Sequence, residues 1–93
     1  MARIASYVMQ MRYKYGQHLL LVDGGDVLQG QPSCYYCNYV QPSMENVAAR
    51  VMNVLGYDLQ TIGNHDIETG HAVYDKYAAE ANYDILAANI VCN

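Results

Sequence analysis

The sequence predicts a single small α/β domain in which helices alternate with mainly parallel strands. Three short apolar runs have the length and composition of strands that are buried in a parallel sheet. A segment with apolar residues at helical spacing precedes each run, and this alternation of helix and strand is typical of parallel sheets. The length of 93 residues allows one domain at most, because domains most often contain about 100–150 residues.

The composition excludes several classes of protein. Apolar residues make up 53% and charged residues 15% of the chain, which excludes a disordered tail and suggests that much of the surface is meant to be covered. Five basic against nine acidic residues give a net charge of −4 without a Lys/Arg cluster, which argues against a nucleic-acid scaffold. The longest apolar run has four residues, too few for a membrane helix or a signal peptide in this chain.

The first helix is predicted over residues 2–15 and the first strand over 19–22. The helix has one apolar stripe and is stopped by Gly16. The strand is a continuous apolar run, which we expect to be buried on both faces. The stripe residues of the helix are Ile4, Val8, Met11 and Tyr15.

The middle of the chain is predicted to contain a long loop, a helix and a strand. Residues 29–42 carry glycine, proline and asparagine and are expected to form the loop. Ser43 is expected to cap the second helix, which ends at Leu55 with Gly56 behind it. The second strand covers residues 59–62.

The last part of the chain is predicted to form a third helix and a third strand. The helix begins near Thr69 or Gly70 and places Val73, Tyr77 and Ala81 on one face. The strand covers residues 85–88. Three strands with one partly covered face leave exposed sheet edges, so we expect an incomplete domain that is prone to self-association.

The cysteines leave two interpretations open. Cys34 and Cys37 form a C-x-x-C pair, which could serve zinc or thiol exchange. A zinc site needs about four ligands, however, and no second ligand pair is present. The pair also lies in a tyrosine-rich loop rather than at a strand–helix junction, which favours two incidental loop cysteines. Cys92 has no evident partner.

Two polar segments follow the first two strands and are the candidates for chemistry. They cover residues 23–30 and 63–68 and hold four of the nine acidic residues. Ligands of open α/β sheets bind beyond the carboxyl ends of the strands. If the two strands are neighbours, about 4.8 Å apart, then Asp26 and Asn64 could reach a pair of metal ions. The plainer alternative is a tight turn in which Asp23 and Asp26 cap loop amides. A phosphate-binding P-loop is excluded, because Gln31-Pro32 replaces the required Lys-Ser/Thr.

These two segments carry motifs of a known family. The sequence G-D-V-L-Q-G at 25–30, paired with G-N-H-D-I-E at 63–68, resembles the calcineurin-like metallophosphoesterases. The residues of both motifs are similar to those in the branch of 5′-nucleotidases and 2′,3′-cyclic-nucleotide 2′-phosphodiesterases. The resemblance covers essentially the whole chain. It implies a partial metallophosphoesterase domain, namely a fragment of a four-layer αββα sandwich.

The resemblance also implies roles for individual residues. Asp26 matches the aspartate that bridges two divalent metal ions (Zn, Mn or similar), and Asn64 matches the asparagine that binds the second ion. His65 matches the histidine that contacts the scissile phosphate and helps the leaving oxygen depart. Glu68, three residues later, is expected to orient His65, with Asp66 as the alternative.

The implied function is hydrolysis of nucleotide phosphate esters by metal-activated water. The family pattern also contains an upstream Asp-x-His and a downstream His and Gly-His-x-His, which residues 1–93 lack. We therefore expect an internal fragment of the catalytic domain, inactive by itself, from a protein of the periplasm or cell envelope. The alternatives are a zinc or thiol-redox module built on Cys34 and Cys37, and a non-catalytic α/β interaction domain.

Overall fold

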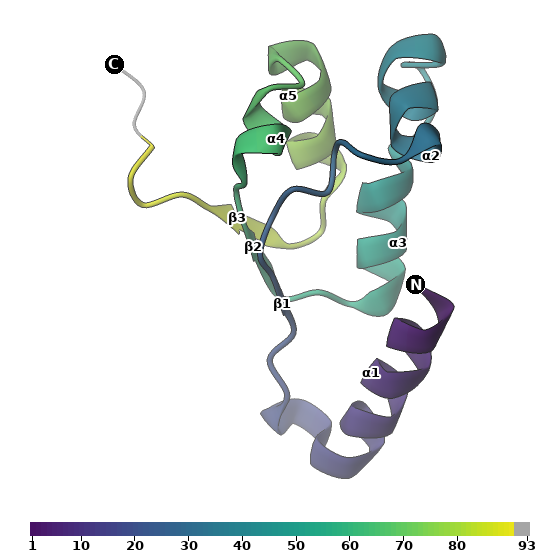
Figure 1. Cartoon of the computed structure of the whole chain (residues 1–93). Coiled ribbons are helices and arrows are strands. Elements are labelled where there is room, and N and C mark those ends of the chain that lie inside the picture. The colour runs from purple at the N-terminus through teal and green to yellow at the C-terminus, as the bar shows by residue number, and fades with distance from the viewer. Residues whose placement is uncertain (91–93) are drawn as a thin grey trace.

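The computed structural model describes residues 1–90 of the chain. Helices and strands alternate along these residues as predicted, and the strands form one parallel sheet in the order β1-β2-β3 (Figure 1). The elements are α1 (Ala2–Tyr15), the 3₁₀ turn η1 (Gly16–His18), β1 (Val22–Asp23), α2 (Pro32–Tyr35), the π-helical turn η2 (Tyr36–Val40), α3 (Val47–Leu55), β2 (Leu59–Thr61), α4 (Asn64–Ile67), α5 (His71–Glu80) and β3 (Asp84–Leu86).

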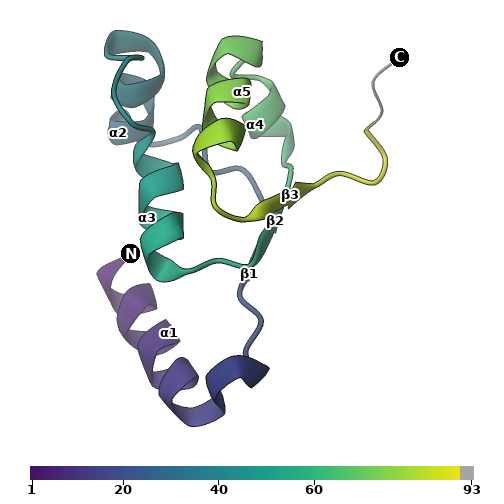
Figure 2. The ribbon, with the colours of Figure 1, turned by 180° about the vertical axis from the view of Figure 1, so that it is seen from behind.

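The sheet is short and is covered by helices on one face. Asp23, Gln60 and Ile85 share a row across the three strands and face the helices. Figures 1 and 2 show α3 and α5 on the same side of the strands. Side chains from these helices and from the segments next to the strands form the core between them, namely Leu28, Ala49, Met52, Val73, Tyr77 and Tyr83.

The other face of the sheet is not covered by residues 1–90. Val22 in β1 is 45% exposed and Leu86 in β3 is 51% exposed. The expectation that the first strand is buried on both faces is therefore wrong, because no element among residues 1–90 packs on this side. The strands are also shorter than predicted, and only Val22 of the run 19–22 is paired in the sheet.

Helix α1 has the predicted bounds, but most of its apolar stripe is not buried. It ends before Gly16, whose φ of +59° is a left-handed conformation that glycine adopts without strain. Only Val8 is buried, whereas Ile4 is 46% exposed and Tyr15 is 47% exposed. The helix lies next to the C-terminal end of α3 (Figure 1). There Arg12 donates a hydrogen bond to the Gly56 carbonyl at 2.7 Å.

The segment predicted as a loop is largely helical. Residues 32–40 form α2 and η2, so the interpretation of 29–42 as irregular is wrong. Pro32 occupies the first turn of α2, where the proton that proline lacks has no intrahelical partner. The buried Asn38 then ties this segment to the first motif by donating from Nδ2 to the Leu28 carbonyl at 2.8 Å.

Helix α3 is capped by Asn46 rather than by Ser43 as predicted. The Asn46 side chain accepts hydrogen bonds from the amides of Ala48 and Ala49 at 3.0 and 3.2 Å. Tertiary contacts fix this choice, because Glu80 accepts from the Asn46 amide at 2.7 Å. The other end of the helix is as predicted, with Gly56 at φ +71°.

A buried polar network joins the covered face of the sheet to α5. Gln60 donates to Asp23 Oδ1 at 3.0 Å and accepts from the Tyr77 hydroxyl at 2.7 Å. The Tyr77 hydroxyl also lies in hydrogen-bond contact with that of Tyr83. Burial raises the pKa of both tyrosines above the ordinary value, so their hydroxyl groups keep their protons and can donate within the network.

Candidate functional site

The two motifs meet at the carboxyl ends of neighbouring strands. β1 and β2 are paired in parallel, with Asp23 opposite Gln60, so the segments that follow them leave the sheet side by side. The His65 amide donates to Asp26 Oδ1 at 3.0 Å, which joins the first motif to the second across 39 positions. The second motif forms the helical turn α4.

Glycines allow this close approach. A Cβ atom on Gly63 would lie 1.9 Å from Asp26 Oδ1, and one on Gly25 would lie 2.5 Å from the Gly63 amide nitrogen. Gly25 has φ +91° and Asp26 has φ +63°, so the first motif turns through two successive left-handed residues. This conformation is unusual for an aspartate and requires support from its surroundings.

The two aspartates of the first motif have different environments. Asp23 Oδ1 accepts hydrogen bonds from the Gly25 amide at 2.8 Å and from Gln60. Asp26 is exposed, and its Oδ2 accepts no hydrogen bond from residues 1–90. The capping contacts of the plainer alternative are therefore present, but Asp26 also keeps a carboxylate oxygen available to a ligand.

Asn64 offers a second oxygen at the same edge of the sheet. Its Nδ2 donates to Glu68 Oε1 at 3.4 Å, so its amide oxygen is the atom left to bind a cation. Carboxylate and amide oxygens suit hard divalent cations, and the pair fits the metal that the family implies. No group of three or more His, Cys, Asp or Glu side chains within residues 1–90 could hold a metal ion by itself.

His65 and Glu68 are in contact, as the family resemblance implies. His65 Nδ1 lies 2.9 Å from Glu68 Oε2, and the two side chains are 52% and 54% exposed. They lie one helical turn apart, His65 within α4 and Glu68 directly after its last residue. A carboxylate on Nδ1 fixes the tautomer of the ring and leaves Nε2 as the atom that can face a substrate.

Asp66 was the alternative partner of His65, and the structure gives its carboxylate other partners. The side chain is 3% exposed. It accepts four backbone amide hydrogen bonds, from Asp26 at 2.7 Å, Val27 at 2.9 Å, Leu28 at 3.1 Å and Gly63 at 3.0 Å. Asp66 is the third residue of α4, and an acid at that position often accepts a hydrogen bond from the amide of the residue before the helix, here Gly63. This pattern was the only local signal in the sequence that Asp66 binds backbone amides.

The cysteine pair gives the redox or zinc interpretation no support. Both thiols are free, and Cys37 is 3% exposed. Cys34 donates to the Val27 carbonyl at 3.4 Å, and burial raises the pKa of its thiol, which lowers the fraction of reactive thiolate. Cys92 lies outside the described residues.

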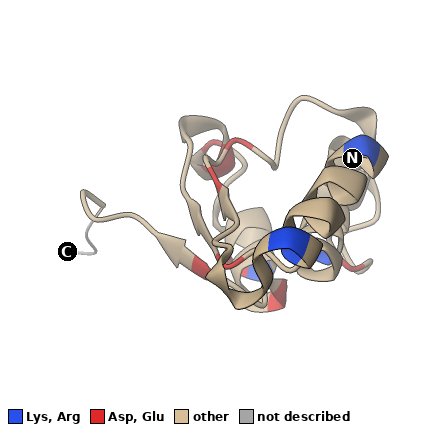
Figure 3. Cartoon of the chain, turned by 90° about the horizontal axis from the view of Figure 1, so that it is seen from below, with Lys and Arg blue, Asp and Glu red and all other residues tan. Residues whose placement is uncertain are grey.

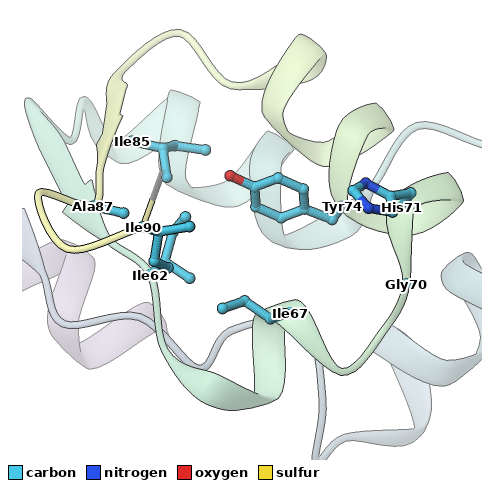
Figure 4. Close-up of a pocket in the computed structure, with 8 residues that line it drawn as sticks. All are labelled: Ile62, Ile67, Gly70, His71, Tyr74, Ile85, Ala87 and Ile90. Carbon is cyan, nitrogen blue, oxygen red and sulfur yellow. The ribbon is translucent and has the colours of Figure 1, made fainter. Parts of the chain in front are cut away.

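The structure has an apolar pocket that does not coincide with the predicted site. The pocket in Figure 4, of about 400 Å³, contains neither Asp26 nor His65. Its lining residues are Ile62, Ile67, Gly70, His71, Tyr74, Ile85, Ala87 and Ile90. Another cleft, of about 380 Å³, reaches Asp26 and runs between the first motif and α3. The pocket in Figure 4 is thus not where the predicted ligands lie.

Basic residues do not gather at the site. All five Lys and Arg residues lie on helices, and three of them lie on α1 (blue in Figure 3). The other two, Arg50 and Lys76, form ion pairs with Glu45 and Glu80 at 3.5 and 3.0 Å. None of the helices within residues 1–90 combines the length and the apolar character needed to cross a membrane.

Comparisons with known proteins agree with the motifs. The chain is 38% identical over 90 residues to a 5′-nucleotidase of Bos taurus, which covers 96% of this chain and 14% of that protein. It is 30% identical over 91 residues to a 2′,3′-cyclic-nucleotide 2′-phosphodiesterase/3′-nucleotidase of Haemophilus influenzae, again over 96% of this chain and 14% of that protein. No family model matches the chain.

A solved structure has the same fold. The crystal structure of the calcineurin-like phosphoesterase YfkN from Bacillus subtilis superposes with a TM-score of 0.83 at 32% identity, over 92% of this chain and 27% of that one. The resemblance predicted from the motifs is confirmed: the chain is a homologue of a portion of these nucleotide phosphoesterases and matches a part of the calcineurin-like phosphoesterase fold. It spans about 14% of the length of the two curated relatives named above.

Proposed function

We propose that this homologue of the calcineurin-like nucleotide phosphoesterases is an internal part of the catalytic domain of a longer protein that hydrolyses phosphate esters of nucleotides. The observation that carries the proposal is the hydrogen bond of 3.0 Å from the His65 amide to Asp26 Oδ1. It brings a free carboxylate oxygen next to the His65–Glu68 pair at the carboxyl ends of two parallel strands, where such sheets bind ligands.

Two divalent cations, zinc, manganese or similar, are the proposed cofactors. Asp26 would hold them through its carboxylate and Asn64 through its amide oxygen, together with ligands from other parts of the longer protein. When bound, such cations polarise phosphoryl oxygens and lower the pKa of a coordinated water towards about 7. A neutral amide ligand also limits the negative charge that an anionic substrate meets.

His65 is the proposed acid for the leaving oxygen. Glu68 Oε2 lies 2.9 Å from Nδ1 and can accept a hydrogen bond from it, which orients the ring and leaves Nε2 to approach the substrate. In its charged form the ring can donate the Nε2 proton to the departing alkoxide. Because both side chains are about half exposed, a substrate can reach the ring without any rearrangement of α4.

The proposed substrate class and cellular location of the longer protein are inferred from its relatives. Their names include a 5′-nucleotidase and a cyclic-nucleotide phosphodiesterase, so nucleoside monophosphates and cyclic nucleotides are the proposed substrates. A location at the cell envelope follows the family expectation and is compatible with venom enzymes among the relatives.

The proposal is tested on a longer protein that contains this chain. With added Mn²⁺, it should release phosphate from AMP and hydrolyse bis-p-nitrophenyl phosphate, and a chelator should abolish both activities. His65→Ala should lower kcat by about 10²–10⁴-fold, the usual contribution of a positioned acid. A double change of Cys34 and Cys37 to serine is the control and should leave turnover unchanged. Turnover that persists with the chelator, or in His65→Ala, would contradict the proposal.

A further inference from the structure

The Asp66 carboxylate joins two segments that are about 40 positions apart in the sequence. On one side it accepts the amides of Asp26, Val27 and Leu28, and on the other that of Gly63. The four distances lie between 2.7 and 3.1 Å, and the side chain is 3% exposed. Both carboxylate oxygens are thus used, and water has little access to compete for these amides.

Only a carboxylate satisfies this arrangement. An ionised carboxyl group has two oxygens with about four acceptor sites and no donor. An asparagine at this position would keep one oxygen and would point an NH₂ group at backbone amides that are themselves donors. At least one of the two segments would then lose its attachment.

The segments held by Asp66 carry the two proposed metal ligands. The Asp26 amide donates a hydrogen bond to Asp66, and the Asp26 side chain is exposed to solvent. Asn64 directly follows Gly63, whose amide also donates to Asp66. Asp66 also helps to support the left-handed conformation of Asp26, whose φ is +63°. A movement of either attachment would therefore change the distance between the Asp26 carboxylate and the Asn64 amide.

We propose that Asp66 is a positioning residue that sets the spacing of the metal ligands Asp26 and Asn64, rather than a partner of His65. The inference rests on the proposed function, since it concerns the same cations. It differs from a purely structural role in one respect: the affinity for the metal should depend on Asp66 more strongly than the stability of the fold explains.

The experiment compares Asp66→Asn with Asp58→Asn in a longer protein that contains this chain. Asp58 is the matched control, because its carboxylate also joins β1 to β2, at 2.7 Å from the Leu21 amide, but at the opposite end of the strands. The metal-free proteins are titrated with Mn²⁺ by calorimetry, and thermal unfolding is followed in parallel. Neither readout requires substrate.

In Asp66→Asn, the dissociation constant for Mn²⁺ should rise by about 10–100-fold, the usual effect of residues that support metal ligands. In Asp58→Asn it should stay within about twofold of the wild type. If Asp66→Asn does not fold, Asp66→Glu keeps the carboxylate but adds one methylene group in a buried space, and its Mn²⁺ affinity should fall at least about threefold.

The outcomes separate the two proposals. Wild-type protein that binds no Mn²⁺ would contradict the proposed function itself. Wild-type protein that binds Mn²⁺, together with a folded Asp66 variant of equal affinity, would overturn the positioning role and leave the proposed function intact. An equal loss of affinity in Asp58→Asn would also overturn it, because the loss would then follow from general destabilisation.

Discussion

The two ends of the β1–β2 pair are both joined by an aspartate, but in different ways. At the amino ends, the exposed Asp58 accepts one amide hydrogen bond, from Leu21, and its own amide donates to the Leu21 carbonyl at 2.9 Å. At the carboxyl ends, the buried Asp66 accepts four amides from two segments. At the amino ends, the pair Leu21–Asp58 thus continues the hydrogen bonding between the strands. At the carboxyl ends, the Asp66 side chain takes the place of backbone-to-backbone hydrogen bonds.

The difference shows at which end of the strands the position of the backbone is held most firmly. At the amino ends the chain only has to enter the sheet, and an exposed contact is sufficient. At the carboxyl ends the chain turns sharply away through Gly25 and Asp26, so the backbone amides lose their sheet partners and a buried carboxylate satisfies them. The proposed ligands lie at this end. Changes there should therefore affect metal binding and turnover, while changes at the amino ends should affect stability alone.

The largest effect is expected for Asp26→Asn. Asp26 offers the free carboxylate oxygen at the carboxyl ends, and the change removes the charge that the cations would share. Turnover of AMP in a longer protein that contains this chain should fall by more than about 100-fold, the upper end for residues that only support a ligand. Near-normal activity with full metal content, measured by atomic emission, would remove Asp26 from the site.

Glu68→Gln is expected to have the next largest effect, and on kcat rather than on metal binding. The change removes the negative charge beside Nδ1 and leaves one acceptor oxygen in place of two, so the orientation of His65 is weakened. We expect kcat to fall by about 10–100-fold with unchanged metal content. If metal content falls together with kcat, Glu68 acts on the ligands and not on His65.

Gly63→Ala tests the close approach of the two motifs through stability. The new Cβ would lie 1.9 Å from Asp26 Oδ1 and 2.8 Å from the Asp26 amide nitrogen. The free energy of unfolding should fall by about 1–3 kcal/mol, as for other overpacked sites. Gly24→Ala is the control in the same loop, because a Cβ there meets no atom within 4 Å. Urea unfolding of both variants decides the matter, and equal stabilities would mean that the motifs are not in contact.

Asp58→Asn should have the smallest effect. The exposed carboxylate makes one side-chain hydrogen bond, and an asparagine oxygen can still accept it. The free energy of unfolding should change by less than about 1 kcal/mol, with kcat for AMP unchanged. A loss of turnover in this variant would end the distinction between the two ends of the sheet.

Part of the architecture and of the site follows from local patterns in the sequence. The alternation of helices with short apolar runs predicts the parallel sheet, and glycines with positive φ end α1 and α3 as expected. The family resemblance implies that Glu68 contacts His65, and the spacing supports it, because positions three apart lie on the same side of a helical turn. These features depend on residues that are close in the chain.

Other features are decided only when distant segments come together. Asn46 rather than Ser43 caps α3, because Glu80 and Asn38 hold Asn46 in place. Residues 32–40 are helical although their composition favours a loop, since Asn38 attaches them to Leu28. In each case a hydrogen bond from another element outweighs a weak local preference.

Asp66 is the clearest example of what tertiary structure adds to the sequence. The sequence determined that an acid follows His65 at the end of a strand, and the family resemblance left Asp66 and Glu68 as candidates for the same role. Only the fold shows that the Asp66 side chain faces the amides of residues 26–28, while Glu68 faces the imidazole. The physical reason is that the partners of a buried carboxylate are set by which backbone amides the turn at Gly25 leaves unpaired, and that depends on a segment about 40 positions away.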